Sequence, residues 1–167
     1  GQLRIYIVSE DGREITLYRL SSGELCVLSA SCVINTINFD VNVDVVEDSE
    51  VVIVNSRAFS DVCKSNIYMD NFSNKIIADR FSKVMWVMEQ IMFMKFDKRL
   101  ALFLIEETEK SGSDTLKFTH EQIAKFTSSA REVVSRMLKY FEKEGIIELS
   151  RGRIKIKDRD RLLEYTE

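Results

Sequence analysis

The feature that most limits how this chain can fold is a helical repeat of apolar residues in its middle. Five of them recur at alternating steps of four and three, the spacing of a coiled-coil seam: Ile77, Phe81, Val84, Met88 and Ile91. Flanking apolar residues add more surface than one helix can bury against itself. We therefore predict a dimerisation helix over residues 66–96 that pairs along this seam with a second copy. The alternative is a central helix in the core of a monomer.

The residues before this helix, 1–65, show the two-residue alternation of strands. Apolar residues alternate on both sides of Asp11-Gly12, which predicts a hairpin with a type I′ turn. A second alternating run over 37–45 turns through 47–50 into another apolar run, Val51–Val54. We predict a small β-roll from these strands. Because the chain starts at Gly1 inside a strand, we expect further residues of this sheet to precede it.

The last part of the chain, residues 97–167, carries the most specific pattern. Asp97 can cap a first helix, and Thr119 stands three residues before Gln122, the capping-box spacing that opens a second. A third helix is expected from about Ser129 to Lys143, followed by a hairpin turning at Arg151-Gly152. Helix, short turn, helix and hairpin predict a winged helix-turn-helix domain.

Charge is unevenly placed along the chain. Residues 1–114 hold 12 Lys and Arg against 18 Asp and Glu, whereas residues 115–167 hold 12 against 9. A basic end joined to an acidic body indicates that the end meets a polyanion. The simpler alternative is a solvated surface with no partner.

A helix-turn-helix domain binds double-stranded DNA by placing its second helix in the major groove, where base pairs differ in their donors and acceptors. Four residues on the exposed side of that helix are predicted to read bases: Arg131, Glu132, Ser135 and Arg136. Arginine can donate two hydrogen bonds to guanine, and glutamate can accept one from cytosine. Phosphate contacts are predicted at Thr119, Lys125, Ser128, Ser129, Lys139, Arg151, Arg153 and Lys155.

The order of β-rich domain, long helix and winged helix resembles the Crp/Fnr family of bacterial transcription regulators. The stretch THEQIAKFTSSAREVVSRMLK resembles the family signature, although Ala130 stands where a serine is often found. The resemblance implies an α+β fold with a cyclic-nucleotide-binding-like sensor roll, and a homodimer on an inverted-repeat operator that recruits or blocks RNA polymerase. It also implies half-site reading by Arg131, Glu132 and Arg136 and a phosphate contact at Thr119.

The resemblance extends to the sensor half, where Gly23-Glu24-Leu25 resembles the start of the family's phosphate-binding cassette. Residues 26–43 contain no arginine to neutralise a phosphate, so we do not expect cyclic AMP as the effector. The effector pocket is predicted at Gly23, Glu24, Cys26, Ser29, Ser31 and Cys32. No particular cofactor is indicated.

The chain has three cysteines and one histidine, His120, which is too little for a histidine-based metal centre or triad. We therefore predict no enzyme and no metal site. A second hypothesis is a thiol- or metal-responsive redox sensor that uses Cys26 and Cys32, with or without DNA binding; buried structural cysteines are the simpler reading. No apolar run approaches the length of a membrane span, so we expect a cytoplasmic protein.

Overall fold

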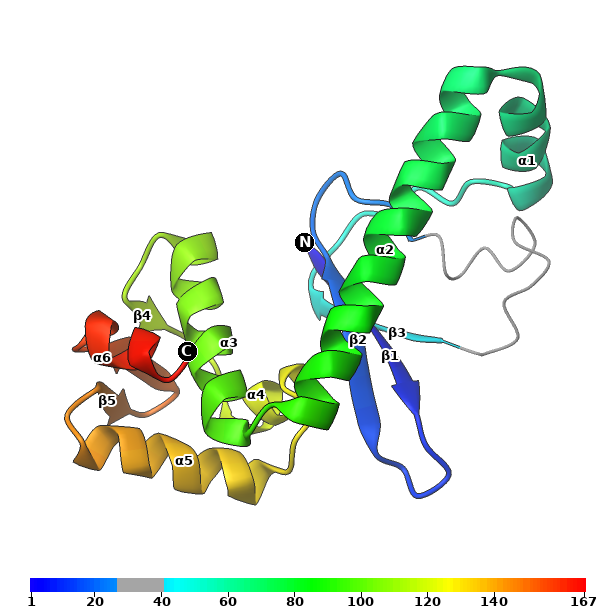
Figure 1. The fold of residues 1–167 in the computed structure, drawn as a ribbon. Coiled ribbons are helices and arrows are strands. Elements are labelled where there is room, and N and C mark those ends of the chain that lie inside the picture. Colours follow the sequence, from blue (N-terminus) through cyan, green and yellow to red (C-terminus); the bar gives the residue numbers. More distant parts are fainter. Residues whose placement is uncertain (27–40) are drawn as a thin grey trace. The chain divides into compact units, whose positions relative to one another are not determined.

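The computed structural model describes residues 1–26 and 41–167 and divides into two compact units, Gly1–Met88 and Glu89–Glu167 (Figure 1). The first unit holds a three-stranded antiparallel sheet and long helical segments, and the second holds short helices around another small antiparallel sheet. The predicted α+β fold is confirmed. Among the described residues, no helix is both long and apolar enough to cross a membrane.

The sheet of the first unit has the order β2-β1-β3, with β1 over Gln2–Val8, β2 over Glu14–Leu20 and β3 over Asn42–Glu47. Its apolar face packs Ile5, Tyr18 and Leu20 into a small cluster. The pairing of β1 with β2 shifts register after Ile5, which leaves Leu17 as an extra residue on β2 that is also buried. The alternation in the sequence therefore corresponds to a sheet with one apolar face.

The turn between β1 and β2 differs from the predicted type I′ turn. The Gly12 N–H donates to the Ser9 carbonyl at 2.9 Å, and the Ser9 N–H donates to the Arg13 carbonyl at 3.0 Å. Gly12 has a φ of 80°, whereas Asp11 has no positive φ. The loop thus has three residues and needs the left-handed conformation only at its glycine, an arrangement typical of three-residue hairpins.

The expected strand at Val51–Val54 is wrong. These residues form no strand and are exposed, with Val52 and Ile53 each 91% accessible. Helix α1, Ser56–Ser65, follows directly and was not predicted. Its cap is Asn55, whose side-chain oxygen accepts from the backbone N–H groups of Arg57 and Ala58.

Helix α2, Ile67–Phe93, confirms the predicted long helix and ends three residues earlier than expected. After a break at residues 94–95, α3 runs over Phe96–Ser111. The cap of α3 is Lys95, so the prediction that Asp97 caps this helix is wrong. Asp97 lies in the first turn instead, where its Oδ1 accepts from the Lys98 N–H at 2.8 Å.

The second unit confirms the predicted winged helix-turn-helix architecture. After α3 come β4 (Thr115–Leu116), α4 (His120–Phe126), α5 (Arg131–Lys143), β5 (Ile147–Ser150), β6 (Arg153–Ile156) and α6 (Arg159–Glu164). The strands form an antiparallel sheet in the order β4-β6-β5. Strand β4 and helix α6 were not predicted. All these elements contribute to one apolar core, which includes Leu100 and Leu104 of α3 and Leu138 and Phe141 of α5.

Two local features mark the start of α4 and the turn between α4 and α5. The Thr119 hydroxyl accepts from the Gln122 N–H while the Gln122 side chain accepts from the Thr119 N–H, which is the predicted capping box. Between the helices, Ser128 takes a φ of 51° and reverses the chain. The polar side of α5 faces outward because Val134, Leu138 and Phe141 on its other side are buried in the core.

Candidate nucleic-acid interface

Helix α5 carries its apolar and polar residues on separate sides. Val134, Leu138 and Phe141 are each 0% accessible and belong to the core of the second unit. Arg131, Glu132, Arg136 and Lys139 are exposed, and Ser135 is half-buried. The four residues predicted to read bases therefore lie on α5 outside its fully buried side.

The arginines of this surface differ from those of α6 in their partners. Arg159 donates to Glu109 at 2.6 Å and Arg161 lies 3.4 Å from Glu144. Within residues 1–26 and 41–167, Arg131 and Arg136 make no ion pair or hydrogen bond. A surface guanidinium without a partner keeps all its N–H donors available for a ligand. Its planar shape allows it to donate two hydrogen bonds to one acceptor edge, such as that of a guanine.

The hairpin of β5 and β6, the wing, carries further basic residues at its tip. Arg151, Arg153 and Lys155 are exposed, and Gly152 has a φ of 69° that allows the tight turn between the strands. Neither arginine makes an ion pair in the described part of the chain. The wing can therefore offer two guanidinium groups to phosphates beside the groove that α5 would enter.

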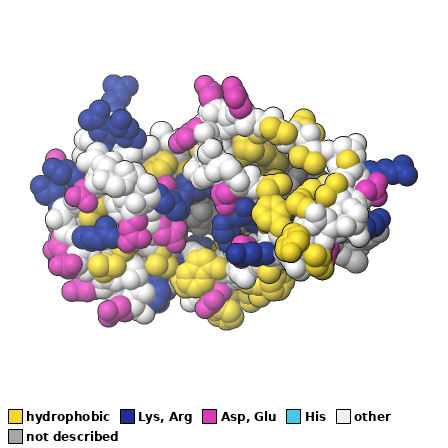
Figure 2. All heavy atoms as spheres, turned by 90° about the horizontal axis from the view of Figure 1, so that it is seen from above, with side chains coloured by type: hydrophobic (Ala, Val, Ile, Leu, Met, Phe, Trp, Pro, Cys, Tyr) yellow, Lys and Arg dark blue, Asp and Glu magenta, His cyan; other side chains and the backbone are white. Residues whose placement is uncertain are grey.

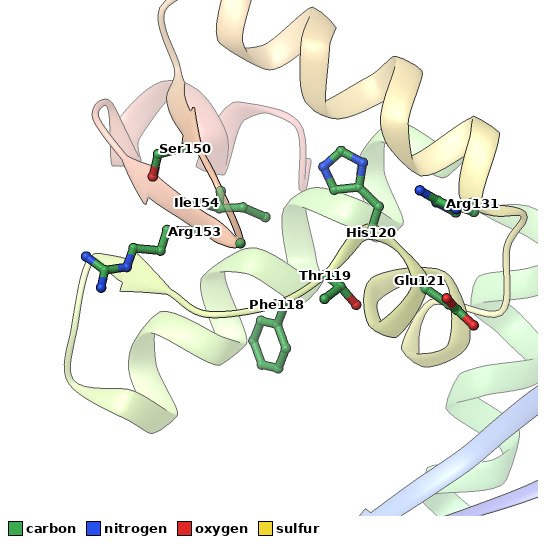
Figure 3. A pocket seen from close by; sticks show the side chains of 9 residues that line it. Phe118, Thr119, His120, Glu121, Arg131, Ser150, Arg153 and Ile154 are labelled. Atoms are coloured by element: carbon green, nitrogen blue, oxygen red, sulfur yellow. The ribbon is translucent and has the colours of Figure 1, made fainter.

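A hollow of about 360 Å³ separates the wing from the starts of α4 and α5 (Figure 3). We call it the wing hollow; it is lined by Phe118, Thr119, His120, Glu121, Arg131, Ser150, Gly152, Arg153 and Ile154. In Figure 3 the imidazole of His120 rises from the start of α4 toward α5, and Glu121 points away from it. The charged groups of the lining are thus two arginines, one glutamate and the histidine.

The remaining residues predicted to contact phosphates have different environments. Thr119 is exposed, and Lys125 and Ser129 are half-buried. Ser128 is only 4% accessible, which leaves almost none of its side chain at the surface. The sequence offered no signal for this burial, because it follows from the left-handed turn that tucks Ser128 against the end of α4.

The predicted effector region is described only in part, since Ser29, Ser31 and Cys32 lie outside the described residues. Gly23, with a φ of 80°, precedes Glu24 at the edge of a hollow of about 1220 Å³. This sensor hollow is also lined by Leu20, Cys26, Val51–Val54 and Ile76, among others. Its walls come from the sheet, from the segment before α1 and from α2.

Glu24 is held by α2. Its Oε1 accepts from Arg80 Nη2 at 3.1 Å and lies 3.5 Å from Lys83 Nζ, while Oε2 accepts from the Ser21 N–H at 2.7 Å. Partial burial acts to raise the pKa of Glu24, but the Ser21 N–H and the two cations outweigh it and hold that pKa below its ordinary value. The net result is an ionised carboxylate tied to the helix.

Arg80 is a residue of this region that sequence reasoning missed. It is 5% accessible, stacks over the Tyr18 ring at 5.0 Å and also donates to the Leu25 carbonyl at 3.4 Å. No sequence signal indicated this, because only the packing of α2 shows that Arg80, one helical turn before Val84, faces the same sheet as Val84. Arg80 follows Glu24 by 56 positions and so lies far beyond residues 26–43, which contain no arginine.

Cys26 lies half-buried beside Tyr18, with 3.9 Å between its Sγ and the tyrosine hydroxyl. Burial, together with the nearby thiol, raises the pKa of Tyr18 far above its ordinary value. Among the described residues, no three His, Cys, Asp or Glu side chains come together as a metal site would require.

The predicted seam on α2 is divided between two environments. Val84 packs against the cluster around Ile5 in its own sheet, and Ile77 and Ile91 are half-buried. Phe81 and Met88 are exposed, at 65% and 48%. The exposed apolar residues continue at Met85 and Met92, so that the open seam runs through Phe81, Met85, Met88 and Met92. Steps of four, three and four keep it in coiled-coil spacing, turned slightly around the helix from the prediction.

Comparison with known proteins finds matches to Crp and Crp/Fnr transcription regulators. Residues 98–165 match the family model of the Crp-like helix-turn-helix domain. A solved transcriptional regulator of the Crp/Fnr family from Eubacterium rectale is 47% identical; the match covers 99% of this chain and 77% of that one, with a TM-score of 0.90. The Cyclic AMP receptor protein of Thermus thermophilus is 21% identical over 158 residues, which are 95% of this chain and 72% of that protein.

A third relative shares the fold at low identity. A CRP-family transcriptional regulator from Thermus thermophilus is 20% identical, and the match covers 99% of this chain and 84% of that one with a TM-score of 0.79. The fold is therefore kept where most residues differ.

Proposed function

This chain belongs to the Crp/Fnr family of transcription regulators, and from that premise we propose that it works as a homodimer on an inverted-repeat DNA operator and is modulated by an effector. The observation that carries the proposal is the exposed polar side of α5, with two arginines that have no partner in the described chain. Contact with RNA polymerase would convert operator binding into activation or repression.

In the proposed complex α5 lies in the major groove. Arg131 and Arg136 each donate two hydrogen bonds to a guanine, Glu132 accepts from a cytosine amino group, and Ser135 contacts a neighbouring base edge. Glu132 precedes Arg136 by four residues, yet no ion pair joins them in the described chain, so neither has to be released before it meets DNA.

Phosphate contacts are proposed from the elements that flank α5. They come from Thr119, Lys125, Ser129, Lys139, Arg151, Arg153 and Lys155, all of which have accessible side chains. We leave out Ser128 because its side chain is buried. These contacts would fix the register of the protein on the duplex and supply most of the salt-dependent affinity.

Dimerisation is proposed along the open seam of α2. Four large apolar side chains are exposed in one stripe of this helix. Contact of apolar surface with water is unfavourable, so a second surface that covers the stripe is stabilising. Pairing with the same helix of a second copy buries the stripe on both sides and presents two α5 helices to two half-sites.

The effector is proposed to bind in the sensor hollow beside Gly23, Glu24 and Cys26. Because Arg80 and Lys83 tie Glu24 to the helix that carries the dimer seam, a ligand that moves Glu24 changes the contacts of α2. A ligand that binds one arrangement more tightly shifts the population toward it.

A thiol-based response is a second candidate, because Cys26 lines the sensor hollow. Titration with a thiol reagent, followed by measurement of operator binding, tests it. A change in binding that the Cys26→Ser variant abolishes would support this candidate, and an unchanged affinity would exclude it.

The main test compares Arg136→Ala with Lys139→Ala on an operator selected from random duplex DNA. Loss of a base contact weakens specific binding by about 1–3 kcal/mol, roughly 5-fold to 150-fold, and leaves non-specific binding nearly unchanged. Loss of a phosphate contact weakens both kinds of binding alike. Equal losses on both kinds of DNA for Arg136→Ala would contradict base reading by α5.

A further inference from the structure

His120 lines the wing hollow but has no role among the contacts proposed so far. It is half-buried at the first position of α4, and its imidazole makes no hydrogen bond or ion pair within the described residues. The backbone of residue 120 is held firmly, because the capping box closes around it from Thr119 to Gln122. The capping box therefore fixes the backbone from which the ring extends, and the ring nitrogens stay available to a ligand.

The side chains that line the wing hollow are of the types that bind a phosphate. One of its charged groups is the guanidinium group of Arg153 from β6, and Arg131 of α5, which the proposed complex directs to a guanine, adds positive charge beside it. The hydroxyls of Thr119 and Ser150 add donors from α4 and β5. In a helix-turn-helix complex the first helix crosses the DNA backbone while the second enters the groove, so the start of α4 and this hollow would border the same strand.

We propose that His120 contacts a DNA phosphate in the wing hollow and that DNA binding takes up a proton there, an inference that rests on the DNA binding proposed above. Imidazole is the side chain that ordinarily changes its charge near neutral pH. The phosphate favours the charged form, since an opposite charge within a few ångströms stabilises it. The other charged groups facing the hollow are Arg131, Arg153 and Glu121.

The sign of the effect follows from linkage. The complex binds more protons at His120 than the free protein does, so the affinity for DNA falls as the pH rises through the range in which imidazole titrates. The chain has a single histidine. A dependence of DNA affinity on pH that comes from a histidine must therefore come from His120.

The experiment measures the affinity of the full chain for its selected operator at about pH 6 and about pH 8 for the wild type, His120→Gln and His120→Lys. We expect wild-type affinity to fall by about threefold to tenfold over this range. A change of one unit in the pKa of a group on binding corresponds to a tenfold change in affinity. The Gln variant, which is always neutral, should bind weakly at both values, and the Lys variant, which is always charged, should bind tightly at both.

Salt dependence gives a second readout. One extra phosphate contact changes the slope of log K against log salt by about 0.9, so the wild type should match the Lys variant at low pH and the Gln variant at high pH. If no variant binds duplex DNA at either pH, the DNA-binding proposal itself fails. If all three bind DNA and His120→Gln keeps the wild-type pH dependence, this inference alone is overturned.

Discussion

The two units of this chain bury their apolar residues to different extents. In the second unit, buried residues from α3 to α6 and from all three strands join in one core. In the first unit, the described core is a cluster of Ile5, Leu17, Tyr18 and Leu20, while many large apolar side chains stay exposed. Figure 2 shows this contrast, with more hydrophobic side chains at the surface of the first unit.

The difference indicates that most apolar residues of the second unit are covered within that unit, whereas many of those of the first unit need a further surface to cover them. The first unit also buries two arginines, Arg4 and Arg80, both 5% accessible or less. Buried charges are costly unless they are paired, so the ion pairs of these residues matter more than pairs at the surface. Substitutions in the open seam, in the two cores and in these ion pairs therefore test whether the two units differ in this way.

The largest effect is expected from Met85→Glu combined with Met88→Glu. Both residues are exposed in the single chain, so the fold of one copy tolerates the charges, whereas a paired seam would bury them. We expect the dimer dissociation constant to rise by about a thousandfold, or about 4 kcal/mol. Sedimentation measures it, with Lys75→Glu on another side of α2 as the control. A wild type that is monomeric at high concentration would refute the proposed seam.

Next come matched leucine truncations in the two cores, Leu104→Ala and Leu20→Ala. Leu104 is 0% accessible inside the larger core, and we expect its loss to cost about 3–5 kcal/mol. Leu20 is 4% accessible in the smaller cluster, which can relax around the space, and about 2 kcal/mol is expected. Hydrogen exchange read separately for each unit measures both, and equal costs would contradict the contrast between the cores.

A buried arginine in the first unit gives the third prediction. Arg4 donates to Thr16 Oγ1 at 2.7 Å and to Glu14 at 2.6 Å, and it lies 4.1 Å from the centre of the Tyr6 ring. We expect Arg4→Met to destabilise the first unit by about 2 kcal/mol, because its partners lose a buried donor. Denaturant unfolding measures this, and Arg13→Met in the exposed turn should have little effect.

The smallest effect concerns Glu24 and pH. Its pKa lies below the ordinary value in the folded chain, so its pairs stabilise the fold above that ordinary value and are lost as the pH falls through the folded value. The wild type should therefore lose stability more steeply than Glu24→Gln in the acidic range. We expect a difference below about 1 kcal/mol, because water screens a carboxylate that is 32% accessible. Identical acid profiles would show that Arg80 and Lys83 contribute nothing through this residue.

The second unit was predicted well because its signals are local. The capping box at Thr119 and the hairpin turn at Arg151-Gly152 each depend on residues a few positions apart. Strand β4 escaped prediction because its two residues, Thr115 and Leu116, are a strand only through pairing with Lys155 and Ile154. Such a short segment carries no periodicity of its own.

The first unit was predicted less well because its contacts are distant in sequence. Val51–Val54 has the composition of a strand, yet no described strand pairs with it. Val84 was assigned to the dimer seam by spacing alone, and it packs on the sheet instead. A repeat of apolar residues identifies a helix, but which residues face the protein's own sheet is decided by packing.

By itself, the sequence determined the long helix, the first hairpin and the winged helix-turn-helix, because spacing, caps and turn residues act over a few positions. Only the tertiary structure decided that Arg80 reaches Glu24 across 56 positions, that Ser128 is buried and that His120 shares a hollow with Arg131 and Arg153. These facts depend on which surfaces meet when the chain is folded, and burial and electrostatic attraction between distant residues leave no periodic trace in the order of amino acids.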